Sequence, residues 1–246
     1  MPLKQKIGLI VWLMILLVVL GLNDSDIIKL VALMGFPLVF MGFGPKIYPK
    51  LHLKQKFWFI PLCSSITLPI FFIDRQADLF YFVATWEYWL LAILPPLFSL
   101  LFRIKECYQA IKVSILMEPI QTRVFIRRFI QASWLLAAEE ILFRALFYDV
   151  LSNQGHYIYY FALNAIVFVF YHHFNRFSNY KLKDYVFQAL LAIHLSALYI
   201  YSDSLIFCII SHFVYNSVYF ITMVLNTKVL EKMKIKGGSN GRSFVK

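Results

Sequence analysis

Long apolar stretches, separated by short polar segments, recur along almost the whole chain of 246 residues. Eight of them approach or reach the ~20 residues that a helix needs to cross the hydrocarbon core of a bilayer. Only helices satisfy their own backbone in lipid, and the segments lack the alternation of barrel strands, so each is predicted to be a helix. The predicted spans are Ile7–Leu22, Ile27–Phe43, Phe57–Ile73, Trp86–Phe102, Phe129–Tyr148, Tyr157–Phe174, Tyr185–Tyr201 and Leu205–Leu225.

The composition supports the same fold class. Hydrophobic residues make up 61% of the chain and charged residues only 15%, against roughly 25% charged in an average soluble protein. No repeat, low-complexity tract or soluble domain interrupts the pattern. We therefore predict an all-α, polytopic membrane bundle of about eight transmembrane helices, forming a single domain over residues 1–246.

The basic residues are distributed as the positive-inside rule expects. Lys and Arg gather in alternate connections and in the tail, whereas the opposite connections are short and acidic or neutral. This predicts a multi-pass protein of the cell membrane with both termini in the cytoplasm and a cytoplasmic tail over residues 226–246. The connection Arg103–Arg128 mixes apolar and basic residues, which predicts an amphipathic helix on the cytoplasmic interface.

The net charge of +11 is explained by this topology. The basic residues form no folded patch with interleaved aromatic residues, so nucleic acid is not an expected partner. The bilayer is the partner that the distribution indicates.

Three charged residues interrupt the fifth predicted span, in the stretch AAEEILFRALF. A charge at the centre of a membrane helix costs roughly 2.5–3.5 kcal/mol, so each needs a partner or a water-filled cavity. Glu140 and Arg144 are four residues apart, in the order favoured for an ion pair on one helix face. Glu139 projects about 100° away from Glu140. The pairing therefore accounts for Glu140 and Arg144 and leaves Glu139 without a cation nearby on the same helix.

Imidazole and amide groups occur in three later spans, and each has an ordinary structural explanation. His172 and His173 lie at the end of the sixth span, where an aromatic belt is typical. His212 and Asn216 share one face of the eighth span, and such groups often hydrogen-bond between membrane helices. His194 in the seventh span has no patterned partner. Whether His173 or His194 assists a site is left open.

Taken together, these groups indicate chemistry. Glu139, His172, His212 and Asn216 supply a general base, a group that orients water and donors for an oxyanion, the set needed for hydrolysis by activated water. A catalytic cavity inside the bundle is therefore predicted. His172 lies only four residues from Arg176. A helix that continues past Phe174 toward Lys181 would bring it to the depth of the other groups.

Three motifs, in order, resemble the CAAX-protease and bacteriocin-processing family of intramembrane proteases, also called Abi. The family's EExxxR motif corresponds to Glu139–Arg144, FxxxH to Phe168–His172, and HxxxN to His212–Asn216. The resemblance covers the chain from about Phe129 to Leu225.

The resemblance implies an endopeptidase that cleaves peptide or protein substrates at the membrane without a covalent intermediate. Carried over by position, Glu139 and His172 activate the water, while His212 and Asn216 form the oxyanion site. Substrates remain open: a prenylated protein, a peptide precursor and the tail of a membrane protein all fit.

Supporting roles also follow from the resemblance. Glu140 with Arg144 would brace the helix, and Phe168 would pack beneath the site. No cofactor is expected, although zinc held by Glu139, His172 and His212 is a second possibility. The other alternative is a non-catalytic immunity or regulatory protein of the same family.

Overall fold

The computed structural model describes residues 28, 30–35, 64, 66–73, 79–82, 85–117, 120–152, 157–174 and 180–227. Its elements are helices, and no strand occurs among these residues. In chain order they are the 3-10 helix η2 (Leu68–Phe72) and helices α4 (Trp86–Phe102), α5 (Ile104–Leu116), α6 (Thr122–Glu140), η3 (Ile141–Leu146), α7 (Phe147–Ser152), α8 (Tyr157–Phe174), α9 (Leu182–Ser202) and α10 (Leu205–Tyr215).

The longest rod of the molecule consists of α6, η3 and α7, which follow one another without a break. Its middle part, η3, is a π-helix, in which the backbone bonds run from residue i to i+5. The rod contains the whole predicted fifth span, Phe129–Tyr148. The π-helix begins at the residue that follows Glu140 and includes Arg144, so the charged motif coincides with a change of helical register.

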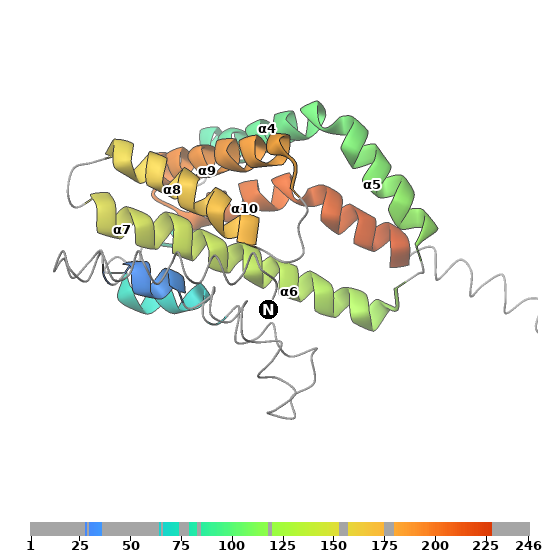
Figure 1. Cartoon of the computed structure of the whole chain (residues 1–246), viewed down its shortest axis with the longest axis horizontal. Coiled ribbons are helices and arrows are strands. Elements are labelled where there is room, and N and C mark those ends of the chain that lie inside the picture. The colour runs from blue at the N-terminus through green and yellow to red at the C-terminus, as the bar shows by residue number, and fades with distance from the viewer. Residues whose placement is uncertain are drawn as a thin grey trace, which may run out of the picture.

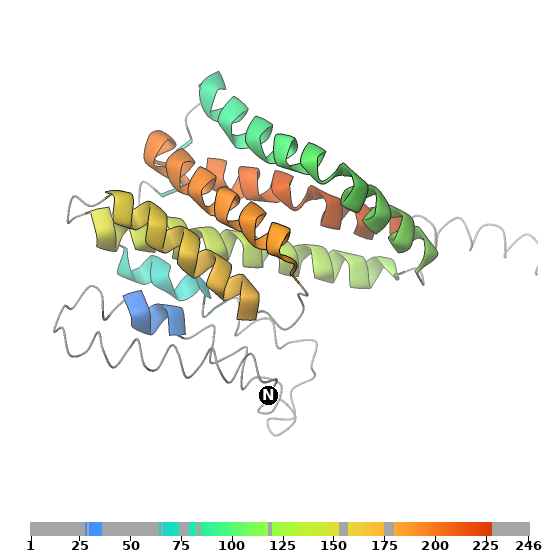
Figure 2. The same ribbon diagram turned by 45° about the horizontal axis from the view of Figure 1, so that its top comes forward.

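Helix α10 lies in the middle of the bundle, where it contacts α4, α9, α6 and η3. Figures 1 and 2 show the α6–α7 rod on one side of α10 and α4 on the other, with α8 crossing close to the rod. Helix α8 packs on both α9 and α7. Residues on α10 therefore face the charged motif while remaining close to α4 and α9.

A tight turn joins α9 to α10. Asp203 adopts a left-handed conformation with φ 49°, which ends α9, and an aspartate tolerates this region better than most residues. Ser204 then caps α10, because its Oγ accepts a hydrogen bond from the Ile206 N–H at 3.3 Å. The short turn makes α9 and α10 antiparallel neighbours and sets the position of the residues along α10.

The predicted eighth span is bent rather than straight. Helix α10 and the following helix, Ser217–Thr227, meet at an angle of 58°. Asn216 lies between them, and its carbonyl accepts a hydrogen bond from the Tyr219 N–H at 3.0 Å. This i to i+3 bond tightens the chain at the bend. The bend follows directly after the helix that carries His212.

The apolar segments agree with the predictions to different degrees. The bounds of α4 and α8 coincide with the predicted fourth and sixth spans, and α9 contains the seventh. In the described part of the chain, one helix, α9, is long and apolar enough to cross a membrane, and the bent pair would be a second. The predicted first span lies outside the described residues, and of the second and third only residues 28, 30–35, 64 and 66–73 are described.

One detail of α8 differs from the prediction. The helix is described as far as Phe174, and Tyr180 and Lys181 are not helical, so it does not reach Lys181. Lys181 instead precedes α9, where its N–H donates to Asp184 Oδ2 at 2.9 Å. A new helix thus begins where the extension was expected, while residues 175–179 lie outside the described part.

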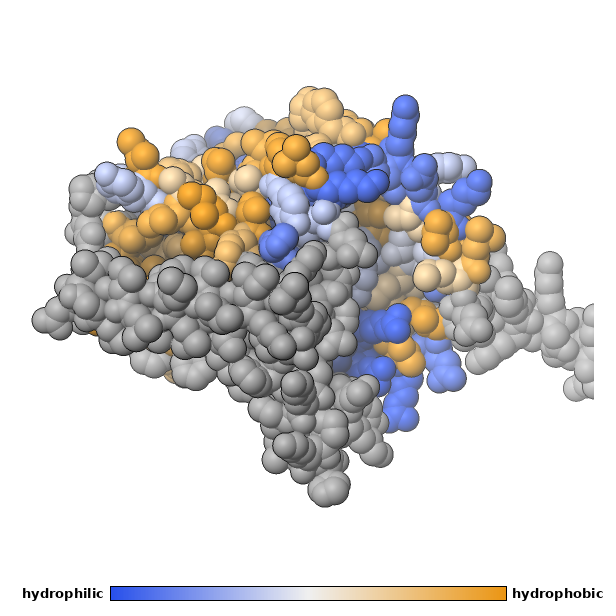
Figure 3. All heavy atoms as spheres, in the orientation of Figure 1, coloured by the Kyte–Doolittle hydropathy of each residue, from blue (hydrophilic) through white to orange (hydrophobic). Residues whose placement is uncertain are grey.

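Polar and apolar surfaces are separated. Figure 3 shows apolar residues over the part of the molecule that contains α8 and α9, and hydrophilic residues gathered near α5 and the first turns of α6. Exposed apolar residues of α8 and α9 include Ile158, Ile166 and Leu190. Exposed basic residues at the other end include Lys112 and Arg127. This arrangement suits a protein with one part in lipid and one at a charged interface.

Ionic contacts join α5 to the start of α9. Arg103, between α4 and α5, contacts Asp184 Oδ1 at 3.1 Å and donates to the Tyr215 hydroxyl at 3.1 Å. Lys183 pairs with Glu106, and this hydrogen bond lowers the pKa of the Glu106 carboxyl. The second pair is largely exposed, so it contributes little to stability. The contacts position α5 beside the bundle.

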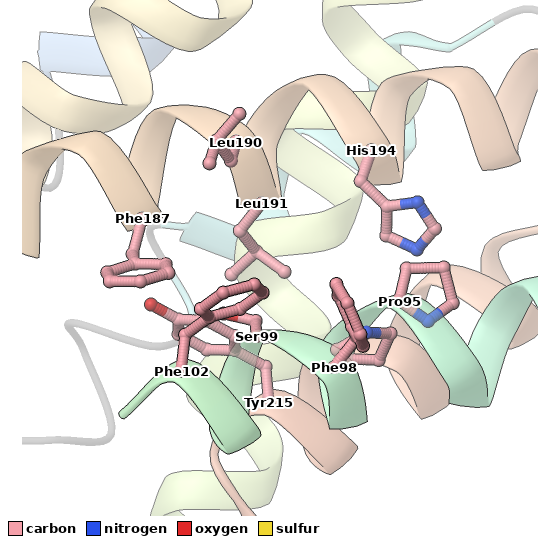
Figure 4. A pocket seen from close by; sticks show the side chains of 10 residues that line it. Pro95, Phe98, Ser99, Phe102, Phe187, Leu190, Leu191, His194 and Tyr215 are labelled. Atoms are coloured by element: carbon pink, nitrogen blue, oxygen red, sulfur yellow. The ribbon is translucent and has the colours of Figure 1, made fainter. Parts of the chain in front are cut away.

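Two adjacent prolines lie inside α4, where each lacks the N–H that an α-helix normally uses. Pro95 consequently cannot bond the carbonyl of Leu91, four residues earlier. His194 of α9 hydrogen-bonds this carbonyl and also lies 3.1 Å from Ser211 Oγ. Figure 4 shows the His194 ring beside Pro95. A neighbouring helix thereby satisfies the backbone group that the proline leaves unpaired.

This arrangement generates a prediction. Replacing His194 with Leu should lower the free energy of unfolding by about 1–3 kcal/mol, because the Leu91 carbonyl, which Pro95 cannot bond, loses its donor. Adding Pro95→Ala should recover part of the loss, since the introduced alanine supplies a backbone N–H to the same carbonyl. Chemical unfolding in detergent of both single variants and the double variant measures the coupling. Strict additivity of the two changes would contradict the contact.

Candidate active site

Glu140 makes direct side-chain contacts to two other residues of the site. Its Oε2 lies 3.1 Å from Arg144 Nε, and its Oε1 accepts a hydrogen bond from His212 Nδ1 at 2.6 Å. The side chains of Glu140 and Arg144 are fully buried, and that of His212 is 3% exposed. The expected pairing of Glu140 with Arg144 is therefore present. The link to His212, across 72 positions in sequence, was not expected.

Phe168 lies where the charged rod meets α8. Its ring lies 4.9 Å from the guanidinium carbon of Arg144, a distance at which a cation is attracted to an aromatic face. The ring centroids of His172 and His212 lie 4.2 and 6.0 Å from that of Phe168. One buried aromatic ring thus contacts Arg144 and both imidazoles.

His172 is held by its own helix. Its Nδ1 lies 2.8 Å from the Phe168 carbonyl, which can only accept, so Nδ1 carries the proton in this contact. The side chain is buried, with 8% exposure. The contact fixes the orientation of the ring.

Glu139 lies next to this network but is not tied into it. Its residue exposure is 7%, and in the described part of the chain no ion pair is formed by its carboxylate. Charges on His212, Glu140 and Arg144 all act on it. The carboxylate of Glu139 is thus close to Arg144 and His212, whereas those two side chains make their direct contacts to Glu140.

Asn216 ends α10 in an uncommon backbone conformation, φ −88° and ψ 7°. This bridge region is sparsely populated and is often found at active sites. The Asn216 N–H donates to the His212 carbonyl at 3.0 Å, so the two residues follow each other by one turn. The side chain is partly exposed at the bend, one turn away from the His212 ring.

The other two candidate histidines make contacts elsewhere. His173 Nδ1 lies 2.7 Å from the Tyr185 hydroxyl on α9. His194 contacts Ser211 and the Leu91 carbonyl, as described above. The two adjacent histidines therefore have different partners. His172 contacts the Phe168 carbonyl, and His173 contacts Tyr185 on α9.

A cavity of about 350 Å³ lies between α4, α9 and α10. Figure 4 shows that Phe98, Phe187, Leu191 and Tyr215 line it, with His194 at one end. None of Glu139, His172 and His212 is among its lining residues. This cavity is separate from the cluster of charged groups.

The donors of the site do not form a metal cage. In the part of the chain that the structure describes, no three His, Cys, Asp or Glu side chains converge as the ligands of a metal ion would. His212 Nδ1 is already bonded to Glu140, and His172 Nδ1 to a backbone carbonyl. The zinc arrangement considered from the sequence would use the remaining nitrogen of each ring.

Sequence reasoning missed Asn164. This fully buried residue of α8 donates from Nδ2 to the Phe143 carbonyl, within the π-helix, at 2.5 Å. A signal was present, because Asn164 precedes Phe168 and His172 by four and eight residues and so lies on nearly the same face of α8. The π-helix itself left no comparable sign in the sequence.

Comparison with known proteins finds one family whose model matches part of the chain. The model of the family described as type II CAAX prenyl endopeptidase Rce1-like matches residues 119–218. This region contains all three motifs identified in the sequence. No curated protein and no solved structure matches the chain significantly.

The double pairing of Glu140 generates a prediction. Arg144→Met should lower the free energy of unfolding by about 3–5 kcal/mol, because it leaves a buried carboxylate without its cation. Adding Glu140→Gln should recover much of that loss. Unfolding in detergent measures both variants.

The exposed pair Glu106–Lys183 provides the matched control for this experiment. Its side chains are 41% and 46% exposed, so Lys183→Met should cost at most about 1 kcal/mol. Equal losses for Arg144→Met and Lys183→Met would show that the Glu140–Arg144 pair is not buried as described.

Proposed function

We propose that this chain is an intramembrane endopeptidase using activated water, a proposal supported by the match of residues 119–218 to the type II CAAX prenyl endopeptidase Rce1-like family. The match supports a protease of the membrane. The residue roles proposed here rest on the geometry of the charged cluster.

The proposal rests on the different contacts that two adjacent glutamates, Glu139 and Glu140, make. Glu140 is engaged by both Arg144 and His212, which contact one carboxylate oxygen each. Glu139 has no ion pair among the described residues and lies in the same electrostatic field. A carboxylate in that situation is suited to act as a general base.

The reaction then follows from the remaining groups. Glu139 removes a proton from a water that His172 orients, and the water oxygen attacks the carbonyl carbon of the scissile peptide bond. His212 and Asn216 donate hydrogen bonds to the oxyanion of the tetrahedral intermediate. When the C–N bond breaks, Glu139 returns the proton to the leaving amine.

The contact between Glu140 and His212 supports the oxyanion role. With Nδ1 donating to Glu140, His212 can donate toward the substrate only if Nε2 is protonated as well. In that form the ring faces the Glu140 carboxylate, to which it is bonded through Nδ1.

We also propose the full topology of eight transmembrane helices with both termini in the cytoplasm. The described helices α4, α8 and α9 and the bent pair after Ser204 correspond to four of the predicted spans. On this topology the bend at Asn216 and the charged end near α5 lie toward the cytoplasm. Substrates would be peptides or protein tails that reach the membrane from that side.

The mechanism predicts that Glu139→Gln lowers kcat by at least about 10²–10⁴-fold, the range expected for a lost general base. Reconstituted enzyme and peptidomics of cells carrying the wild type or the variant measure the effect. Glu106→Gln, a change at a partly exposed acid outside the spans, serves as the control and should cleave normally.

Two outcomes would redirect the proposal. Unchanged cleavage by a folded Glu139→Gln variant would sink this mechanism and favour a non-catalytic immunity or regulatory protein. Activity that a chelator abolishes and added zinc restores would favour the metal-dependent alternative.

The topology has its own test. Single cysteines placed at Asp26, Asp78 and Asp203 should react with a membrane-impermeant thiol reagent from outside intact cells. Cysteines at Lys54, Lys112 and Lys183 should react only after the membrane is opened. Labelling of either set from the wrong side would contradict the eight-span arrangement.

A further inference from the structure

The π-helix lies at a sensitive position in the rod. It starts at Ile141, directly after the two glutamates, and contains Arg144. Because π-bonding runs from i to i+5, a π-turn inserts an extra residue relative to the α-helix and is rare without support from the surroundings. Such turns are frequently found at functional sites. A contact from the surroundings must therefore maintain the π-turn of η3.

Asn164 of α8 makes that contact. Its Nδ2 donates to the Phe143 carbonyl at 2.5 Å and lies 2.9 Å from Ser196 Oγ on α9. Ser196 uses its own proton to bond the Ala192 carbonyl at 2.8 Å, so its oxygen accepts from the amide. Both neighbours of Nδ2 are acceptors, which settles the orientation of the amide group.

The surroundings make this amide costly to replace. Asn164, Ser196 and the neighbouring Tyr160 of α8 are fully buried. Without the amide, the buried Phe143 carbonyl would lose this donor. The backbone can relieve this by returning to i to i+4 bonding, which removes the extra residue from the turn. Residues on either side would then rotate against each other by up to about 100°.

That rotation would act on the site. Glu140 lies before the π-turn and Arg144 inside it, while His212 is bonded to Glu140. On α8, Asn164, Phe168 and His172 follow each other at intervals of four residues, and Phe168 contacts both Arg144 and His172. One face of α8 therefore holds the π-turn and also carries the water-orienting histidine.

We propose that Asn164 is a positioning residue, whose amide holds the π-turn of η3 and so sets the orientation of Glu140, Arg144 and His212. Its kinetic consequence rests on the proposed protease function. Its structural consequence, the geometry of the Glu140–His212 contact, does not depend on any substrate.

The experiment compares Asn164→Leu, which keeps the branched shape of the side chain and removes the donor, with Ser202→Ala. Ser202 is also buried and bonds the Leu198 carbonyl at 2.7 Å near the end of α9, so its loss tests a buried hydrogen bond away from the π-turn. Both variants should lose thermal stability. Only Asn164→Leu should lower kcat, by at least about tenfold, with KM changed by less than about twofold.

A spectroscopic reading separates positioning from a general loss of stability. In ¹⁵N-histidine-labelled protein, the Nδ1 proton of His212 should give a downfield resonance, because it is bonded to a carboxylate at 2.6 Å. Asn164→Leu should shift or broaden this resonance in the folded protein, and Ser202→Ala should leave it unchanged. Asn164→Ala carries the same expectation if the leucine prevents folding.

The outcomes distinguish this inference from the proposed function. An unchanged His212 resonance in a folded Asn164 variant overturns the positioning role, as does a loss of activity that only follows the folded fraction. If the wild type cleaves no peptide while the resonance responds to Asn164, the positioning role stands and the protease function does not.

Discussion

A carboxylate buried in an apolar bundle must find cations, and the rest of the structure depends on how Glu140 does so. It contacts Arg144 on its own rod and His212 on α10. A buried ion pair adds little net stability, but losing one member is costly, so the contact constrains where the helices lie. It fixes α10 against the rod of α6, η3 and α7. Glu139 then lies beside Arg144 and His212 without an ion pair of its own in the described structure.

Two departures from regular helix occur beside this contact. The π-turn follows Glu140 directly, and α10 ends at Asn216 with a bend of 58°. Each irregularity changes which side chains and backbone groups face the site. Neighbouring helices stabilise the first through Asn164, just as His194 covers the carbonyl freed by Pro95 in α4. Irregular backbone in such a bundle is tolerated where a side chain from another helix satisfies it.

Much of the fold could be predicted because the bilayer simplifies the problem. The bounds of α4 and α8 follow from apolar composition and from the polar residues at their ends. The i,i+4 pairing of Glu140 with Arg144 is likewise local. Predictions that required long-range information were less successful. The extension of α8 to Lys181 was wrong, because Lys181 belongs to the start of α9. The single domain over residues 1–246 stays a prediction.

The sequence by itself determined that the chain is helical, that its segments suit a membrane, and which residue types are available for chemistry. It did so because apolar periodicity and residue spacing are local properties of the chain. Only the tertiary structure decided that His212 bonds Glu140, that Asn164 bonds the Phe143 carbonyl in the π-helix and that His173 contacts Tyr185. These contacts join residues on different helices, and their geometry is set by how the helices pack. The two glutamates of AAEEILFRALF are alike in sequence, and packing alone makes one a brace and the other a candidate base.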